Sequence, residues 1–238
     1  SYVDGMSVGL MAPSGEIVGW EKEQMGTQRL RYRSTSILVY HGFPSPYSQA
    51  QEIYFDFIPT EDYVDSGIWQ VLVRGERIVT GRYDLWLPPV STVNVSTRFL
   101  EPDPEITLTI PSTSALAISA GAYDSAYRAY ADFSGRGYTR LTNQVKPDLA
   151  APGVDITAPR AGGGYGSFTG TSFAAPFVTG AAALLMQWGI VLGNDPYLYG
   201  EKMKAYLRGG AGRLPGEPLW PNEKLGYGTL CVRDSLPL

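Results

Sequence analysis

The sequence has 238 residues, of which 44% are hydrophobic and 18% are charged, so the chain can bury one large core or two smaller ones. Its net charge of −4, with no run of basic residues, argues against nucleic acid as a partner. The single cysteine, Cys231, excludes an internal disulfide.

The first five residues, Ser-Tyr-Val-Asp-Gly, lack the basic and apolar regions of a secretory signal peptide. This abrupt start is more typical of a cut within a longer protein, or of a processing product, than of a translation start. We therefore expect the sequence to be part of a longer protein.

Residues 1–100 repeatedly alternate between apolar and polar side chains and show almost no helical period, which predicts β-strands. Turn residues follow each alternating run. The apolar positions are Val8 and Leu10; Ile53, Phe55 and Phe57; Trp69, Val71 and Val73; and Tyr83, Leu85 and Leu87. Several short strands separated by turns predict a β-sandwich, or jelly roll, over residues 1–103.

Aromatic side chains in this region could stack on the apolar face of a sugar. Their spacing mostly follows the strand alternation, so we expect most of them in the core. His41, the only histidine, could serve as a general base, but its place at the end of an expected strand predicts a surface or turn residue. The sequence offers no metal site, since zinc needs several Cys, His or carboxylate ligands at workable spacing.

Residues 101–105 are acidic and proline-rich, which predicts a linker before a second region, residues 104–238. Residues 116–122 are a short apolar run typical of a strand buried on both faces, as parallel sheets require, and 149–156 predict a tight turn and another such strand. A helix is expected from Ser172 and another over 197–207, with Gly209 and Gly210 as its stop. Strands alternating with helices predict an α/β fold.

Residues 170–185 combine a turn of small residues, one serine and an alanine-rich apolar helix. A helix start has N–H groups without intrahelical partners and a partial positive charge, so Ser172 would lie beside donors for an anion. Its own N–H could hold the oxyanion formed when its hydroxyl attacks a carbonyl. Pro176 is tolerated in a first turn. The pattern predicts a helix that starts near Ser172 or Phe173, with Ser172 as a candidate nucleophile.

On the residues alone, other interpretations of this stretch stay open. Ser172 could be only an N-cap. Residues 173–192 are long and apolar enough for a transmembrane helix. Polar interruptions and the lack of a basic flank favour a helix buried in a large core instead, so we expect no membrane span.

Five motifs follow the order in which they occur in subtilisin-family serine proteases, the subtilases. Residues 118–124 resemble a strand ending in Val-Gly-Ala-x-Asp, 132–137 a Phe-Ser-x-x-Gly turn, and 146–153 the motif Lys-Pro-Asp-x-x-Ala-Pro-Gly. Residues 170–176 resemble the nucleophile motif Gly-Thr-Ser-Met-Ala-x-Pro, and residues 220–228 the closing turn. Residues from about 106 to 238 therefore resemble the C-terminal half of a subtilase catalytic domain, with its parallel sheet.

This resemblance implies a serine endopeptidase in which Ser172 attacks the scissile carbonyl and forms an acyl-enzyme. It implies that Phe168, Thr169, Gly170 and Thr171 contribute to substrate binding and that the substrate is a protein or peptide. It implies no cofactor beyond a weak cation site near Asp148.

In subtilases the catalytic aspartate, the histidine and the oxyanion asparagine precede the serine, and their motifs are missing from residues 1–171. The residues after Asp4 do not match the aspartate motif Asp-Thr/Ser-Gly, and those after His41 do not match the histidine motif His-Gly-Thr-His. Ala122 stands where Ser-Ala-Gly-Asn would have asparagine. A serine without its base is a weak nucleophile, so we expect this chain to be inactive alone and to pair with a missing N-terminal half.

A β-domain directly before the Val-Gly-Ala strand resembles the Csp-type proteases of bacterial spore germination, which carry a jelly-roll insert between the histidine-bearing and serine-bearing halves. Residues 67–69 and 81–88 resemble that insert. The resemblance implies that residues 1–103 are the insert, and it implies an extracellular or spore-associated location with a role in germination proteolysis. The alternative is a non-catalytic pseudoprotease, or a jelly-roll module that binds a partner or glycan.

Overall fold

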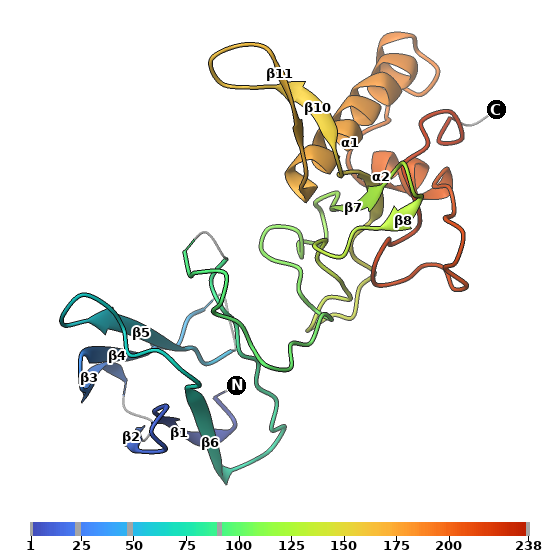
Figure 1. The fold of residues 1–238 in the computed structure, drawn as a ribbon. Coiled ribbons are helices and arrows are strands. Elements are labelled where there is room, and N and C mark those ends of the chain that lie inside the picture. Colours follow the sequence, from blue (N-terminus) through green and yellow to red (C-terminus); the bar gives the residue numbers. More distant parts are fainter. Residues whose placement is uncertain (1, 22–24, 47–49, 90–91, 237–238) are drawn as a thin grey trace. The chain divides into compact units, whose positions relative to one another are not determined.

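The chain divides into two compact units, Ser1–Thr97 and Arg98–Leu238 (Figure 1). The structure, a computed structural model, describes residues 2–21, 25–46, 50–89 and 92–236. The linker predicted at residues 101–105 is irregular chain, and the boundary expected after residue 103 falls inside unit 2.

The described residues of unit 1 form two three-stranded antiparallel sheets. The first has the order β2-β1-β6, with β1 at Gly5–Met11, β2 at Ile17–Glu21 and β6 at Gln70–Arg77. The second has the order β3-β4-β5, with β3 at Gly26–Tyr32, β4 at Thr35–His41 and β5 at Ile53–Pro59. The alternating runs around Val8, Ile53 and Val71 thus form strands, as predicted.

The two sheets of unit 1 contribute side chains to one hydrophobic cluster. Leu10 comes from β1, and Ile37 and Val39 come from β4; all three are buried. The ring of Trp69 meets Tyr32 edge-on at 5.4 Å between centroids and Phe57 at 5.1 Å. The period-two pattern therefore places one face of each sheet in a shared core. The jelly-roll connectivity stays a prediction.

His41 is buried, with 1% of its surface exposed, and it is the last residue of β4. The prediction of a surface or turn residue is therefore wrong. The physical reason is the strand alternation, which continues one step further than expected: Ile37, Val39 and His41 share the inward face of β4.

Residues 83–87 were predicted as a strand, and this prediction is wrong for the described chain, where residues 78–89 are irregular and largely exposed. Alternating side chains are not sufficient for a strand, because the backbone also needs a hydrogen-bonded neighbour. The chain leaves β6 through a turn held by Asp4, whose carboxylate accepts hydrogen bonds from the N–H groups of Val79 (2.6 Å), Thr80 (2.9 Å) and Gly81 (3.2 Å).

Unit 2 combines a small mixed sheet, a hairpin and two helices (Figure 1). The sheet has the order β8-β7-β9: β7 (Ala120–Asp124) is parallel to β9 (Leu149–Pro152) and antiparallel to β8 (Ala129–Tyr130). The hairpin joins β10 (Ile156–Pro159) and β11 (Tyr165–Phe168). Helix α1 (Thr171–Met186) continues as a π-helical turn, η1 (Gln187–Val191), and α2 spans Gly200–Gly209.

The predicted start of α1 and stop of α2 agree with these bounds, whereas β7 begins later than residue 116. One face of α1 lies in the core of unit 2. Ala174, Val178, Ala181 and Leu185 recur at helical spacing and are buried. They belong to one cluster with Ala122 of β7, Leu149 and Ala151 of β9, and Met203 and Leu207 of α2.

One flank of α1 and η1, beside the buried face, is apolar but uncovered in the described chain. Phe177, Leu184 and Val191 are 43%, 55% and 75% exposed, and their spacing of seven residues places them on one stripe. We call these three residues the outer stripe. A helix that is apolar on all sides is typical of a large core or a membrane span.

The stretch Thr171–Val191 is long and apolar enough to cross a membrane by length and composition, and 28% of its 18-residue apolar window is buried. One such helix is weak evidence for a span, since core helices meet the same criterion. Its inner face already packs in the core of unit 2.

Candidate active site

The predicted nucleophile, Ser172, lies in the first turn of α1, at the second helical position, and is exposed. Gly170 precedes the helix with φ 155°, a conformation that residues with a side chain rarely adopt. The Phe173 N–H donates to the Gly170 carbonyl at 3.0 Å. The N-cap position therefore belongs to Gly170, without a capping side chain, and the interpretation of Ser172 as an N-cap is wrong.

The start of α1 leaves Ser172 with free hydrogen-bonding groups. Within the described residues, neither its N–H nor its hydroxyl has a hydrogen-bond partner. The first N–H groups of a helix carry a partial positive charge and lack intrahelical acceptors. The Ser172 N–H can therefore donate to an oxyanion formed next to its own hydroxyl oxygen.

A contact from a distant part of the sequence fixes the turn before Ser172. The Gly170 N–H donates to the Gly153 carbonyl at 2.8 Å, and the Gly153 N–H donates to Tyr123 of β7 at 3.0 Å. A Cβ atom on Gly153 would lie 2.6 Å from the Cβ of Ala122. Only glycine therefore fits at position 153, between the sheet and the turn before Ser172. This role of Gly153 was not predicted, although the motif that contains it was.

The residues expected to bind substrate lie directly before the nucleophile. Phe168 ends β11, where it pairs with Ile156 of β10, and Thr169, Gly170 and Thr171 lead into α1. The Thr169 hydroxyl accepts a hydrogen bond from the Asp155 N–H at 3.1 Å. Their role in substrate binding stays a prediction.

The structure adds Phe173 to this group. Its ring stacks on that of Phe168, with 5.1 Å between centroids and 17° between planes. The two rings form an apolar surface immediately beside Ser172. The sequence held a signal for this contact, since Phe173 stands where the subtilase motif has methionine.

Unit 2 contains no histidine, because the only one in the sequence is His41 of unit 1. The carboxylate of Asp4 is occupied by residues 79–81 of unit 1. The described residues of unit 2 therefore give Ser172 no imidazole base. The described part of unit 2 thus contains the candidate nucleophile without an imidazole that would activate it.

Asp148 lies in a buried charge network. The Lys146 ammonium donates to its Oδ2 atom at 2.8 Å, and the Arg208 Nε–H donates to its Oδ1 atom at 3.0 Å. The Ser119 N–H also donates to Oδ2, at 2.6 Å. The side chains of Asp148 and Lys146 are 0% and 1% exposed. The cation site near Asp148 stays a prediction, and both of its oxygens already have cationic partners.

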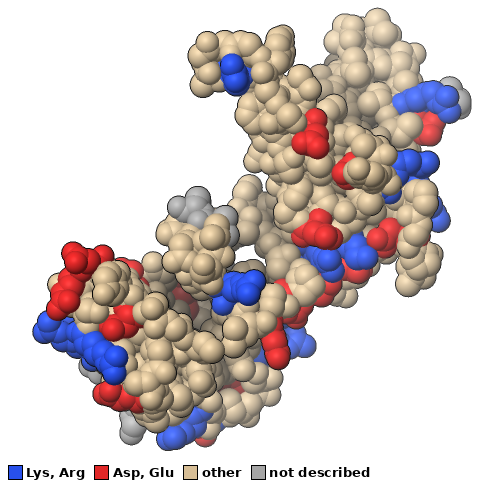
Figure 2. All heavy atoms as spheres, viewed as in Figure 1, with Lys and Arg blue, Asp and Glu red and all other residues tan. Residues whose placement is uncertain are grey.

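Charged side chains are sparse around the candidate site. Figure 2 shows few coloured residues over α1 and the β10–β11 hairpin. Among the described residues, no group of three or more His, Cys, Asp or Glu is placed to hold a metal ion. The chemistry displayed here is that of an exposed serine at a helix start, next to an aromatic surface.

Residues 90–228, more than half of the chain, match the family model described as "Subtilase family". The minor extracellular protease Vpr of Bacillus subtilis is 46% identical over 115 residues, which are 44% of this chain and 13% of that protein. Serine protease AprX of the same organism is 31% identical over 151 residues, 55% of this chain and 32% of that protein.

The solved structure of the CspB protease from Clostridium perfringens is similar to both units. It is 36% identical to this chain with a TM-score of 0.84, and the match covers 99% of this chain and 49% of that chain. The chain thus spans about half of the CspB protease. It spans 13% of the length of Vpr and 32% of the length of AprX.

Proposed function

Since this chain belongs to the subtilase family, whose proteases hydrolyse peptide bonds, we propose that it is the serine-bearing part of a serine endopeptidase with Ser172 as its nucleophile. One observation carries the proposal. The hydroxyl of Ser172 is exposed at the start of α1, in a turn that requires glycine at position 170. This turn lies within the matched residues.

In the proposed reaction, the Ser172 oxygen attacks the carbonyl carbon of the scissile peptide bond. The serine proton passes to a base, and the negative charge that develops on the carbonyl oxygen is stabilised by the Ser172 N–H. The base then protonates the leaving amine, which leaves an acyl group on Ser172. A water molecule hydrolyses that ester and restores the serine.

The base comes from outside the described chain in this proposal, because unit 2 has no histidine. The outer stripe gives the missing part a place to bind. Phe177, Leu184 and Val191 continue α1 away from Ser172 as an exposed apolar row. A part of the longer protein that covers this row would bring its own residues next to the nucleophile turn, and the chain alone would be inactive.

The stacked rings of Phe168 and Phe173 form, in our proposal, an apolar wall of the substrate site. Gly170 and Thr171 let a peptide backbone approach the serine closely. The substrate is a protein or peptide.

The similarity to the CspB protease over both units supports a finer proposal. Unit 1 would be a jelly-roll insert within a Csp-type protease, which would act in spore germination. The similarity to Vpr, an extracellular protease, supports an extracellular or spore-associated location.

Casein hydrolysis by the longer natural protein tests the proposal. We expect Ser172→Ala to lower the rate by about 10⁴-fold or more, the loss typical of nucleophile removal in serine proteases. Ser125→Ala, on an exposed turn of unit 2, is the matched control and should leave the rate unchanged.

Unchanged activity in Ser172→Ala would refute the assignment of the nucleophile. A folded natural protein without any peptidase activity would favour the pseudoprotease. If the 238-residue chain alone hydrolysed casein and lost this activity in Ser172→Ala, the proposed need for a missing base would be wrong.

A further inference from the structure

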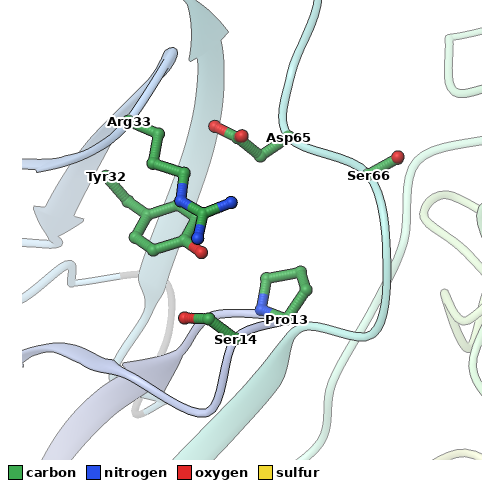
Figure 3. A pocket seen from close by; sticks show the side chains of 6 residues that line it. All are labelled: Pro13, Ser14, Tyr32, Arg33, Asp65 and Ser66. Carbon is green, nitrogen blue, oxygen red and sulfur yellow. The ribbon is translucent and has the colours of Figure 1, made fainter.

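We propose that unit 1 carries a binding site of its own, for a single sugar ring with adjacent hydroxyl groups, in a pocket far in sequence from Ser172. The pocket has a volume of about 230 Å³ (Figure 3). It is lined by Pro13, Ser14, Tyr32, Arg33, Asp65 and Ser66. This inference does not depend on the proposed protease function.

Three connections of unit 1 meet at this pocket. Pro13 and Ser14 belong to the turn between β1 and β2, Arg33 to the turn between β3 and β4, and Asp65 to the loop between β5 and β6. The two sheets therefore each contribute loops to one end of the shared core. Loops held by a rigid scaffold are a common location for binding residues.

Hydrogen bonds hold Asp65 in place before any ligand binds. Its Oδ2 atom accepts from the Ser34 N–H at 3.1 Å, the Ser34 hydroxyl at 3.0 Å and the Thr35 hydroxyl at 2.8 Å. The Asp65 N–H donates to the Thr35 oxygen at 2.8 Å, and the Trp69 indole N–H donates to the Asp65 carbonyl at 3.0 Å. The carboxylate is thus fixed by its neighbours, as preorganised sites require.

The loop that carries Asp65 also packs against the turn between β1 and β2, which forms the other side of the pocket. Gly67 has φ 131°, and a Cβ atom there would lie 2.7 Å from the Cβ of Pro13. This approach requires glycine and sets the distance between the two walls.

Arg33 contributes the second charged group. Its backbone has φ 44°, in the left-handed region that few residues other than glycine, asparagine and aspartate adopt. The two-residue connection between the paired residues Tyr32 and Thr35 requires this conformation. The guanidinium lies over the Tyr32 ring, 5.1 Å from its centroid.

Figure 3 shows the Arg33 guanidinium extending into the space above the ring of Pro13, while Asp65 lies at the edge of that space with its carboxylate turned toward the β3–β4 turn. The Thr35 and Ser34 hydrogen bonds, with the charge of Arg33, hold the pKa of Asp65 below its ordinary value of 3.8. Both groups are therefore charged near neutral pH, with opposite signs.

Opposite charges in one pocket suit a ligand without net charge that can both donate and accept hydrogen bonds. A pair of neighbouring hydroxyls does both: its oxygens accept from the guanidinium fork, and its hydrogens donate to the carboxylate. The Pro13 ring offers an apolar surface to the C–H groups of the sugar ring that carries these hydroxyls. The pocket volume of about 230 Å³ lies below the range of about 300–1,000 Å³ for drug-sized ligands. A pocket of this size suits a ligand as small as one pyranose ring.

Saturation-transfer NMR on the 238-residue chain tests this proposal with methyl glucoside, methyl galactoside and N-acetylglucosamine. Glycine serves as a small zwitterion for comparison. We expect saturable binding of at least one sugar with a Kd in the millimolar range, which corresponds to about −4 kcal/mol.

Arg33→Asn removes the guanidinium while asparagine tolerates the left-handed backbone, and we expect it to weaken binding about 10-fold or more. Arg29→Asn is the matched control, since Arg29 is an exposed arginine of β3 outside the pocket, and it should bind as the native chain does. Arg33→Gly, which suits the backbone equally well, replaces Arg33→Asn if that variant fails to fold.

Three outcomes would overturn the proposal: no saturable binding of any of the sugars up to about 100 mM, equal binding by the Arg33 variant, or binding of glycine in preference to all sugars. The last outcome would assign the pocket to zwitterions such as amino acids.

Discussion

Leu184 and Leu185 are neighbours on α1 with opposite environments. Leu185 is 0% exposed in the core cluster of unit 2, whereas Leu184 is 55% exposed on the outer stripe. Truncating either residue to alanine removes the same atoms from the same helix. The pair therefore isolates the effect of burial.

For Leu185→Ala in the 238-residue chain we expect the free energy of unfolding to fall by about 2–5 kcal/mol. Buried methylene groups contribute about 0.8 kcal/mol each, and the cavity left behind adds to that loss. In a unit of this size the Tm should fall by roughly 4–20 °C. Leu184→Ala should change the free energy by about 0.5 kcal/mol or less, as is usual for an exposed position.

The same two variants in the longer natural protein test whether the outer stripe is covered there. We expect Leu184→Ala to become destabilising by about 2–5 kcal/mol, similar to Leu185→Ala. Urea unfolding followed by circular dichroism, with calorimetry for Tm, measures both series.

Two results would refute this reasoning. Equal losses for both variants in the 238-residue chain would mean that the outer stripe is already buried. A neutral Leu184→Ala in the longer protein would mean that nothing packs on it.

Three further predictions concern stability. Asp148→Ala should cost about 3–5 kcal/mol in urea unfolding, because it leaves a buried ammonium without its partner; a neutral result would contradict the buried network. Gly226→Ala should destabilise the chain more than Gly216→Ala in the same assay. Both glycines have positive φ, but a Cβ on Gly226 would lie 2.0 Å from a carbonyl oxygen, whereas nothing lies within 4 Å at Gly216. Asp4→Asn should lower the urea midpoint near neutral pH. The Thr80 hydroxyl and the N–H groups of residues 79–81 hold the pKa of Asp4 below its ordinary value of 3.8, so its stabilising effect is complete above that pH and is lost as the pH falls below it. The difference between Asp4→Asn and the native chain should therefore shrink at about pH 2, and a difference independent of pH would contradict this role.

Sequence patterns correctly predicted those helices and strands whose formation depends on the side chains of the same segment. The alternation of Ile53, Phe55 and Phe57 predicted β5, and the turn of small residues before an apolar helix predicted the start of α1 within a residue or two. The order of the motifs predicted the family. These features depend on periodicity and on residues close together in the sequence.

Strand pairing and packing contacts between residues far apart in the sequence could not be predicted from the sequence patterns. Residues 83–87 have the same alternation as β5 but have no strand beside them in the described chain, and a single sequence does not say which strands meet. The contact between Gly153 and Gly170 links two motifs separately recognised in the sequence, yet their hydrogen bond depends on how the parallel strands lie. The stacking of Phe168 on Phe173 likewise appears only once β11 and α1 are placed.

The assignment of Ser172 as a nucleophile that needs a base from outside this chain is tested most directly with a fluorophosphonate probe, which reacts with an activated serine. We predict that the longer natural protein is labelled at Ser172 and that its Ser172→Ala variant is not, while the 238-residue chain alone stays unlabelled at the same concentration. Labelling of the 238-residue chain to the same extent, or a folded longer protein that is not labelled, would contradict the assignment.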